Sequence, residues 1–188
     1  MAEPRKHGTV MMTNAEQAAL AAAPKPAAAI VDRWSKHCYG TKSALCFEIG
    51  LTKDQEHTVF LQGATAIGER TYDWKNGKIT VQLSVGEMLG VLGVLLSVKS
   101  KFEGTAHGVE NDKGFSIEHQ GDKFFGKIQQ KNKGMRAVPI TFADATEVAA
   151  LVIGQLCKVM RMSDVALMNL VMRMQPKAPV QPAANARA

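Results

Sequence analysis

The sequence predicts an α+β domain in which two antiparallel four-stranded sheets pack on helices, built as a duplicated ββββα unit. Three observations support this fold class. Segments that alternate apolar and polar residues occur in two groups, which is typical of half-buried strands. Each group ends in an apolar segment that opens with helix-capping residues. The two joints between strand and helix share one outline, which indicates an internal repeat.

The composition sets the limits of the folded part. A chain of 188 residues with 46% hydrophobic residues can bury one good core. Both ends are rich in Ala and Pro and have no apolar period, so residues 1–34 and 175–188 are predicted to be flexible tails. The single domain is expected over residues 35–174, with repeat units at about 43–98 and 102–160 and a C-terminal helix at 163–174.

Four strands are predicted in the first unit. Asn76-Gly77 between the last two is the strongest short signal for a β-hairpin. Their ranges are 45–51, 58–64, 70–74 and 78–84, and in the last one Ile79, Val81 and Leu83 are expected to face inward. The preceding segment, 32–42, is expected to form a short helix or to contact nucleic acid through Arg33, Lys36 and Lys42.

The first helix is predicted from residue 85 to 98. Ser84 and Glu87 stand at capping-box spacing immediately before the apolar run. Three glycines, Gly86, Gly90 and Gly93, each weaken an isolated helix by up to ~1 kcal/mol. We therefore expect close backbone packing of this helix against a sheet or another helix.

The second unit repeats the pattern. Its strands are predicted at 104–110, 114–119, 123–130 and 136–142. Pro139 places the last of these at a sheet edge or a bulge. A helix then begins near residue 142, with Thr141 and Asp144 as candidate caps, and Ser163 begins a further helix.

The joints carry a family resemblance. "WKNGKITVQLSVGE" and "GDKFFGKIQQKNKGMRAVPITFADATEVA", with their duplication, resemble the Whirly-like family of single-stranded nucleic-acid binders over residues 43–172. This group includes plant Whirly proteins, kinetoplastid mitochondrial RNA-binding proteins and positive cofactor 4 coactivators. The resemblance implies two four-stranded sheets on a helical core, assembly of four copies through the helices, and nucleic-acid strands across the outer faces of the sheets. A bacterial or phage relative that acts in recombination or repair would fit the plain, tail-flanked form of this sequence.

The strand at 123–130 has a polar side suited to nucleic acid. Phe125, Lys127, Gln129 and Lys131 share this side at intervals of roughly 7 Å, close to the phosphate spacing of an extended strand. An exposed ring stacks on a base for about 1–3 kcal/mol, and lysines neutralise phosphates. The alternative is a solvated face with Phe125 under a neighbouring loop, because lysine is also common on strand surfaces.

The first unit offers a similar set. Tyr72 and Trp74 share a face and either line the core or stand exposed for stacking, and the sequence leaves both alternatives open. The predicted nucleic-acid contacts are Arg70, Trp74, Lys75, Lys78, Lys123, Phe125, Lys127, Gln129, Lys131, Lys133 and Arg136.

An apolar surface at the C-terminal end indicates self-association. Methionines gather there with Leu167, Leu170 and Val171, and core packing within a monomer is the alternative. The expected state is a homo-oligomer, a tetramer or higher. Its predicted interface residues are Gly90, Gly93, Met160, Met168 and Met172.

Enzymatic and metal sites are not predicted. The histidines and carboxylates lack a base–nucleophile pairing, no glycine-rich phosphate loop follows a strand, and His37, Cys38 and Cys46 lack zinc-ligand spacing. We therefore expect no cofactor, no metal and no catalysis. The cysteines are expected to be free thiols, and the run "MLGVLGVLLSV" is too short to cross a bilayer.

The net charge of +6 and the pI near 9.3 favour polyanionic partners. The leading hypothesis is sequence-tolerant binding of single-stranded nucleic acid, with DNA favoured and RNA as an alternative, for protection or annealing of strands. A scaffold protein whose sheets and helices mediate assembly is the competing hypothesis. A cytoplasmic location of bacterial or phage type is expected, and an organelle matrix stays open.

Overall fold

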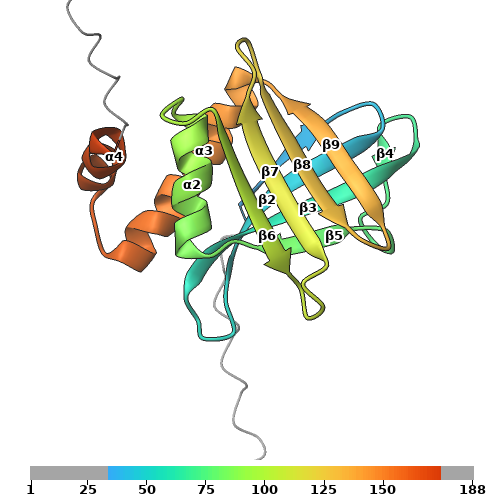
Figure 1. Cartoon of the computed structure of the whole chain (residues 1–188), viewed down its shortest axis with the longest axis horizontal. Helices are drawn as coiled ribbons and strands as arrows, with labels where there is room; N and C mark the ends of the chain where they lie inside the picture. The colour runs from blue at the N-terminus through green and yellow to red at the C-terminus, as the bar shows by residue number, and fades with distance from the viewer. Residues whose placement is uncertain (1–33, 175–188) are drawn as a thin grey trace, which may run out of the picture. The chain divides into compact units, whose positions relative to one another are not determined.

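A computed structural model describes residues 34–174, so the predicted tails, apart from Trp34, lie outside the described residues. Figure 1 shows the arrangement of its elements. In chain order they are β1 (Ser35–Tyr39), β2 (Ser43–Leu51), β3 (His57–Gly68), β4 (Thr71–Tyr72), β5 (Ile79–Gln82), α2 (Val85–Leu95), β6 (Lys101–His107), β7 (Lys113–His119), β8 (Phe124–Gln130), β9 (Gly134–Ile140), α3 (Phe142–Met160) and α4 (Asp164–Arg173).

Two antiparallel sheets form, and the predicted fold class is confirmed. The first sheet has the strand order β1-β2-β3-β5, and the two-residue β4 pairs with the end of β3. The second sheet has the order β6-β7-β8-β9. In Figure 1 the strands of the second sheet run across those of the first, with α2 and α3 to one side.

The first sheet differs from the prediction in its strands. The expected hairpin around Asn76-Gly77 is wrong, because β4 and β5 both pair with β3 as two pieces of one interrupted strand. The true turn includes Arg70, whose φ is 51°. Residues 73–78 leave the sheet as a loop in which the Asn76 amide donates to Asp73 Oδ1 at 2.9 Å. Asn76-Gly77 does lie in a loop, as predicted. The strands on either side of it, β4 and β5, pair with β3 and not with each other.

Segment 32–42 contains β1 and not the short helix that was one of its two expected roles. This strand pairs with β2 over residues 35–39. Lys36 points to α3, where its ammonium lies 2.8 Å from Asp144 Oδ1 and 2.6 Å from Glu147 Oε1. Hydrogen bonds to these carboxylates raise the pKa of Lys36 above its ordinary value. The ion pairs therefore anchor the edge strand to the helix.

The second sheet follows the prediction closely. Its strands differ from the expected ranges mainly at both ends of β6 and at both ends of β9. Pro139 lies on the edge strand β9, as predicted. Phe124, Gly126 and Ile128 are buried on the inner side of β8. This sheet therefore presents its other side to solvent.

Side-chain caps begin all three described helices. Ser84 and Glu87 form the predicted capping box, with the Ser84 amide donating to Glu87 Oε2 at 2.8 Å. Thr141 caps α3 and Ser163 caps α4. α2 ends at Leu95, before the predicted residue 98, because Ser97 adopts a φ of 58°. No described helix is both long and apolar enough to span a bilayer.

The two sheets approach closely at positions without side chains. A Cβ on Gly63 of β3 would collide with Ile128 Cγ2 of β8, and one on Gly126 would lie 2.5 Å from Leu45 Cδ1. Ser43 joins the sheets at their edge, where its hydroxyl donates to the Ala137 carbonyl at 2.9 Å and accepts from the Ala137 amide at 3.1 Å. α2 and α3 complete the core beside this contact.

We predict that Gly63→Ala lowers the free energy of unfolding by about 1–3 kcal/mol, because the added methyl overpacks the contact with Ile128. Urea denaturation measures the change. Gly154→Ala in α3 is the matched control: nothing lies within 4 Å of the added Cβ, and the helix gains up to ~1 kcal/mol. Equal stability of the two variants would contradict a close sheet contact at Gly63.

Candidate nucleic-acid interface

The outer face of the second sheet carries three rows of side chains, fixed by the strand register. One row contains Lys101, Glu118, Phe125 and Pro139. The next contains Glu103, Ser116, Lys127 and Ala137, and the third contains Gly114, Gln129 and Met135. Phe125, Lys127 and Gln129 therefore share one side of β8, as the alternation predicted.

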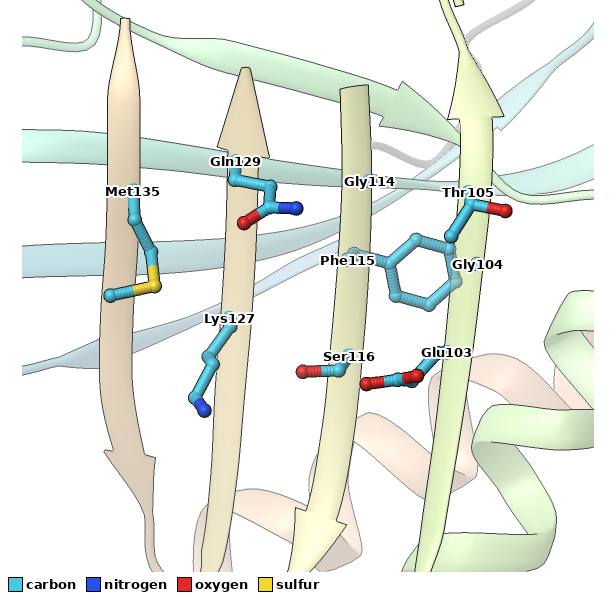
Figure 2. A pocket seen from close by; sticks show the side chains of 9 residues that line it. All are labelled: Glu103, Gly104, Thr105, Gly114, Phe115, Ser116, Lys127, Gln129 and Met135. Carbon is cyan, nitrogen blue, oxygen red and sulfur yellow. The ribbon is translucent and has the colours of Figure 1, made fainter. Parts of the chain in front are cut away.

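A hollow of about 290 Å³ lies on this face, shown in Figure 2. In the view, Lys127, Gln129 and Met135 stand on one side and Glu103 and Thr105 on the other. Gly114 opens its floor, since a Cβ there would lie 3.1 Å from the Gly104 carbonyl oxygen. The ammonium of Lys127 lies 5.6 Å from the centre of the Phe125 ring, a cation–π distance. Ring, cation and amide therefore border a shallow polar depression.

Positive and negative side chains are equally frequent on the outer face of the second sheet, whereas the sequence predicted a basic face. Lys101 is paired with Glu103 at 2.7 Å, and Lys127 shares the face with Glu118. Since the cations and carboxylates here are equal in number, this face alone attracts a polyanion only weakly.

The excess of cations lies at one end of the sheet, where the β8–β9 turn meets the loop 73–78. Lys133 Nζ donates to the Lys78 carbonyl at 3.2 Å, and Lys113 Nζ donates to the Thr80 carbonyl at 3.2 Å. Two carboxylates, Asp73 and Asp112, accompany this group. We call the group the basic seam: it consists of Lys75, Lys78, Lys113, Lys131, Lys133 and Arg136.

The outer face of the first sheet is aromatic. Trp74 makes an edge contact with His37 at 5.1 Å between ring centres, and Tyr39 stacks on Tyr72 at 5.5 Å. Tyr72 and Trp74 are half-buried, between the two alternatives that the sequence left open. Their rings lie outside the core, on the sheet's outer side.

The family comparison agrees with this architecture. The family model described as Whirly transcription factor matches residues 46–151, more than half of the chain. The chain belongs to the Whirly family. The Whirly domain implies single-stranded nucleic-acid binding, and the family is a nucleic-acid-binding, non-enzymatic one. Comparison with curated proteins and with solved structures gives no significant match.

The Whirly domain brings together most of the predicted contact residues, but not all of them. Lys75 and Lys78 of the 73–78 loop and Lys131 and Lys133 of the β8–β9 turn belong to the basic seam, where the Lys133 ammonium donates to the Lys78 carbonyl. The Lys78 ammonium itself donates to Gln62 Oε1 at 2.9 Å, on the outer side of the first sheet. Lys123 lies before β8, at the opposite end from Lys131 and roughly 26 Å from it along an extended strand. Arg70 is exposed at the β3–β4 turn of the first sheet.

Arg136 does not lie on the outer face. It pairs with Ile128 and shares the inner side of the second sheet with it. Its guanidinium donates to the carbonyls of Lys133 at 2.6 Å and Gly77 at 3.4 Å. The side chain therefore ties the turn to the loop of the other sheet, and supports the seam without facing a ligand.

Tyr39 and His37 were not among the predicted contacts. Tyr39 is 62% exposed and stands on the same side of β1 as His37. The alternation of Ser35, His37 and Tyr39 was the available signal, but no apolar residue repeats on the opposite side to mark a strand. The rings of this Whirly domain therefore extend beyond the set that the sequence indicated.

The predicted interface residues occupy different surroundings. Gly90 packs within the protomer, since a Cβ there would collide with the Phe102 ring of β6, and Gly93 is buried. Met160 packs against the core, and Met168 is half-buried. Met172 is 47% exposed on α4. Of this set, Met172 is the residue most available to a second copy.

Reactive thiols and metal ligands are not arranged for chemistry in the described part of the chain. Burial raises the pKa of Cys38 to about 12 and that of Cys46 to about 11. Cys38 faces the core and Cys46 the outer side of the first sheet. Across residues 34–174 we find no group of three or more His, Cys, Asp or Glu residues placed to hold a metal ion.

We predict that Phe125→Ala weakens binding of oligo-dT by about 1–3 kcal/mol, roughly 5- to 150-fold, because a base loses its stacking partner. Fluorescence anisotropy measures the affinity. Phe125→Tyr keeps the ring and is expected to bind like the wild type. An unchanged dissociation constant for Phe125→Ala would remove this ring from the interface.

Proposed function

We propose that this Whirly protein binds single-stranded nucleic acid with little sequence preference, on the outer face of the second sheet and the basic seam. The observation that carries the proposal is the continuous series from Phe125 through Lys127 and Gln129 to Lys131 and Lys133. The β8 members of the series lie on the side opposite the buried Phe124, Gly126 and Ile128, where an extended strand can reach them.

The chemistry of the series supports tolerance of sequence. Every base has a face that can stack on Phe125, whatever its hydrogen-bonding edge. The lysines of the seam neutralise phosphates, which are the same in every sequence. A duplex offers its phosphates but keeps its bases stacked on each other. Stacking therefore favours single strands, and charge provides the salt-dependent part of the affinity.

DNA is the favoured strand, with RNA as the alternative. The family's description as a transcription factor supports DNA. The role we propose is protection or annealing of exposed strands during recombination, repair or transcript handling. The proposed location is the cytoplasm, for a protein of bacterial or phage-like origin. Sequence-tolerant stacking and charge suit this role, because exposed strands carry any sequence.

Self-association is part of the proposal. α4 exposes a group of apolar side chains, and its cap residue Met174 adds to them. Their exposed fractions are 66% for Val165, 38% for Leu170, 47% for Met172 and 69% for Met174. Exposed apolar groups of this kind commonly mark protein interfaces. A homo-oligomer would bring several basic seams onto one particle.

We expect oligo-dT to bind at least about fivefold more tightly than a blunt duplex, because one stacked base contributes about 1 kcal/mol or more. Affinities for oligo-dT, oligo-rU and the duplex at two salt concentrations test this. Replacing Lys127, Lys131 and Lys133 by Gln should lower the slope of log affinity against log salt by about 2.

A matched triple variant controls for net charge. Lys53, Lys99 and Lys158 are exposed and lie outside the β8 row and the basic seam, so their replacement by Gln should leave the slope unchanged. Equal affinity for single strands and duplex, or no salt dependence, would overturn the proposal. If the first variant binds normally but fails to assemble, the scaffold hypothesis replaces it.

Light scattering tests the oligomer separately. We expect the particle to exceed the 20.3 kDa of one chain, and Met172→Glu to reduce its mass because a charge enters the apolar surface of α4. Ile67→Glu is the control, since Ile67 is 67% exposed on β3, away from that helix. A wild-type particle with the mass of one chain would contradict self-association.

A further inference from the structure

A second hollow, of about 480 Å³, lies where the first sheet meets the edge of the second. We call it the tyrosine hollow. It is lined by Tyr39, Gly40, Thr41, Gly68, Glu69, Arg70, Tyr72 and Pro139. Sites for small ligands commonly have volumes of about 300–1,000 Å³, so this one has room for a nucleotide unit.

Tyr72 is fixed in place. Its hydroxyl donates to the Gly40 carbonyl at 2.7 Å, so the ring extends from β4 toward the β1–β2 turn. By register, Ala44 and Ala64 of the intervening strands face the same outer side, and both are fully buried. The side chain therefore crosses a floor of small residues and forms a rigid base for the hollow.

Tyr39 is the available ring. It stacks on Tyr72 with 29° between the ring planes, yet remains 62% exposed. A large aromatic side chain that is held on one side and open on the other offers a surface for a further ring. A nucleobase fits this surface, because stacking on tyrosine needs neither a partner charge nor a defined base edge.

Charge in the tyrosine hollow is balanced. Arg70 is exposed at the turn, and Glu69 lies beside it in the same lining. The guanidinium can meet a phosphate, but the neighbouring carboxylate offsets its attraction. This hollow differs in that respect from the basic seam, where six cations meet two carboxylates. A ligand here is held mainly by ring stacking.

The tyrosine hollow is continuous with the outer face of the second sheet. Pro139 belongs to the row of Phe125 and also lines the hollow. Gly40 lies close to the same edge, since a Cβ there would stand 3.6 Å from Pro139 Cδ. A nucleic-acid strand on the second sheet can therefore pass over β9 into this site without leaving the protein surface.

We propose that the tyrosine hollow binds one unpaired nucleobase of the strand that lies on the second sheet, by stacking on Tyr39. This inference rests on the proposed function and adds to it a site on the first sheet. In this binding mode the basic seam contacts phosphates and the tyrosine hollow stacks on a base. Binding to the seam should therefore weaken with salt, and binding to the hollow should be lost when the base is removed.

The experiment compares Tyr39→Ala with wild type on two ligands of equal length, oligo-dT and an abasic phosphodiester strand, at several salt concentrations. Tyr39→Ala should bind oligo-dT at least about fivefold more weakly. The abasic strand should bind the variant and the wild type equally. The slope against salt should be unchanged, because no cation has been removed.

Tyr39→Phe is the matched control and should bind like the wild type, since it keeps the ring. Thermal unfolding checks that Tyr39→Ala folds. Measuring Phe125→Ala on the same two ligands shows whether loss of a ring weakens binding in general. An equal loss on both ligands, or no loss on oligo-dT, would overturn the inference. Failure of the proposed function differs from either, because the wild type itself would then show no preference for single strands.

Discussion

The close contact between the inner faces of the two sheets determines the rest of this structure. At Gly63 and Gly126 a missing side chain on one sheet admits a branched side chain from the other. Each sheet therefore buries most of one face, and α2 and α3 fill the remaining space beside the contact. Because both inner faces are committed in this way, side chains of opposite parity lie on the outer faces, where exposed ones such as Gln129 and Tyr39 are open to a ligand.

β9 connects the two halves of the proposed surface. The basic seam lies at the start of this edge strand and the tyrosine hollow lies near its end, at Pro139. About five residues of extended chain separate them, roughly 17 Å. Ser43 satisfies both backbone groups of Ala137 in between, which removes part of the free edge from pairing with another strand. This part of the edge is thereby blocked for pairing with another β-strand, while a ligand can still lie over β9.

The sequence predicted what depends on local pattern. The second sheet, the capping box at Ser84 and the two sides of β8 all follow from alternation and capping. The first sheet required information from distant residues: Asn76-Gly77 marks a turn, but only the pairing of β3 decides which strands flank it. The position of Arg136 could have been predicted from the sequence. It shares the parity of Val138 and Ile140, which face inward, so the alternation places it on the inner side of the second sheet. Its charge favours an exposed position, but its place in the alternation turns it inward.

In the binding mode that we propose, the separation of charge from aromatic surface would let one small domain hold a strand without reading its sequence. Phosphate contacts act at long range but weaken with salt, whereas stacking acts only at contact and is nearly independent of salt. On the second sheet cation and ring share one face, since the Lys127 ammonium lies 5.6 Å from the centre of the Phe125 ring, and a base that stacks on Phe125 shares the ring with this contact. Concentrating the cations at the β8–β9 turn leaves Tyr39 free of such competition, since Glu69 offsets the nearby Arg70. A surface divided in this way retains base contacts under conditions that weaken its phosphate contacts.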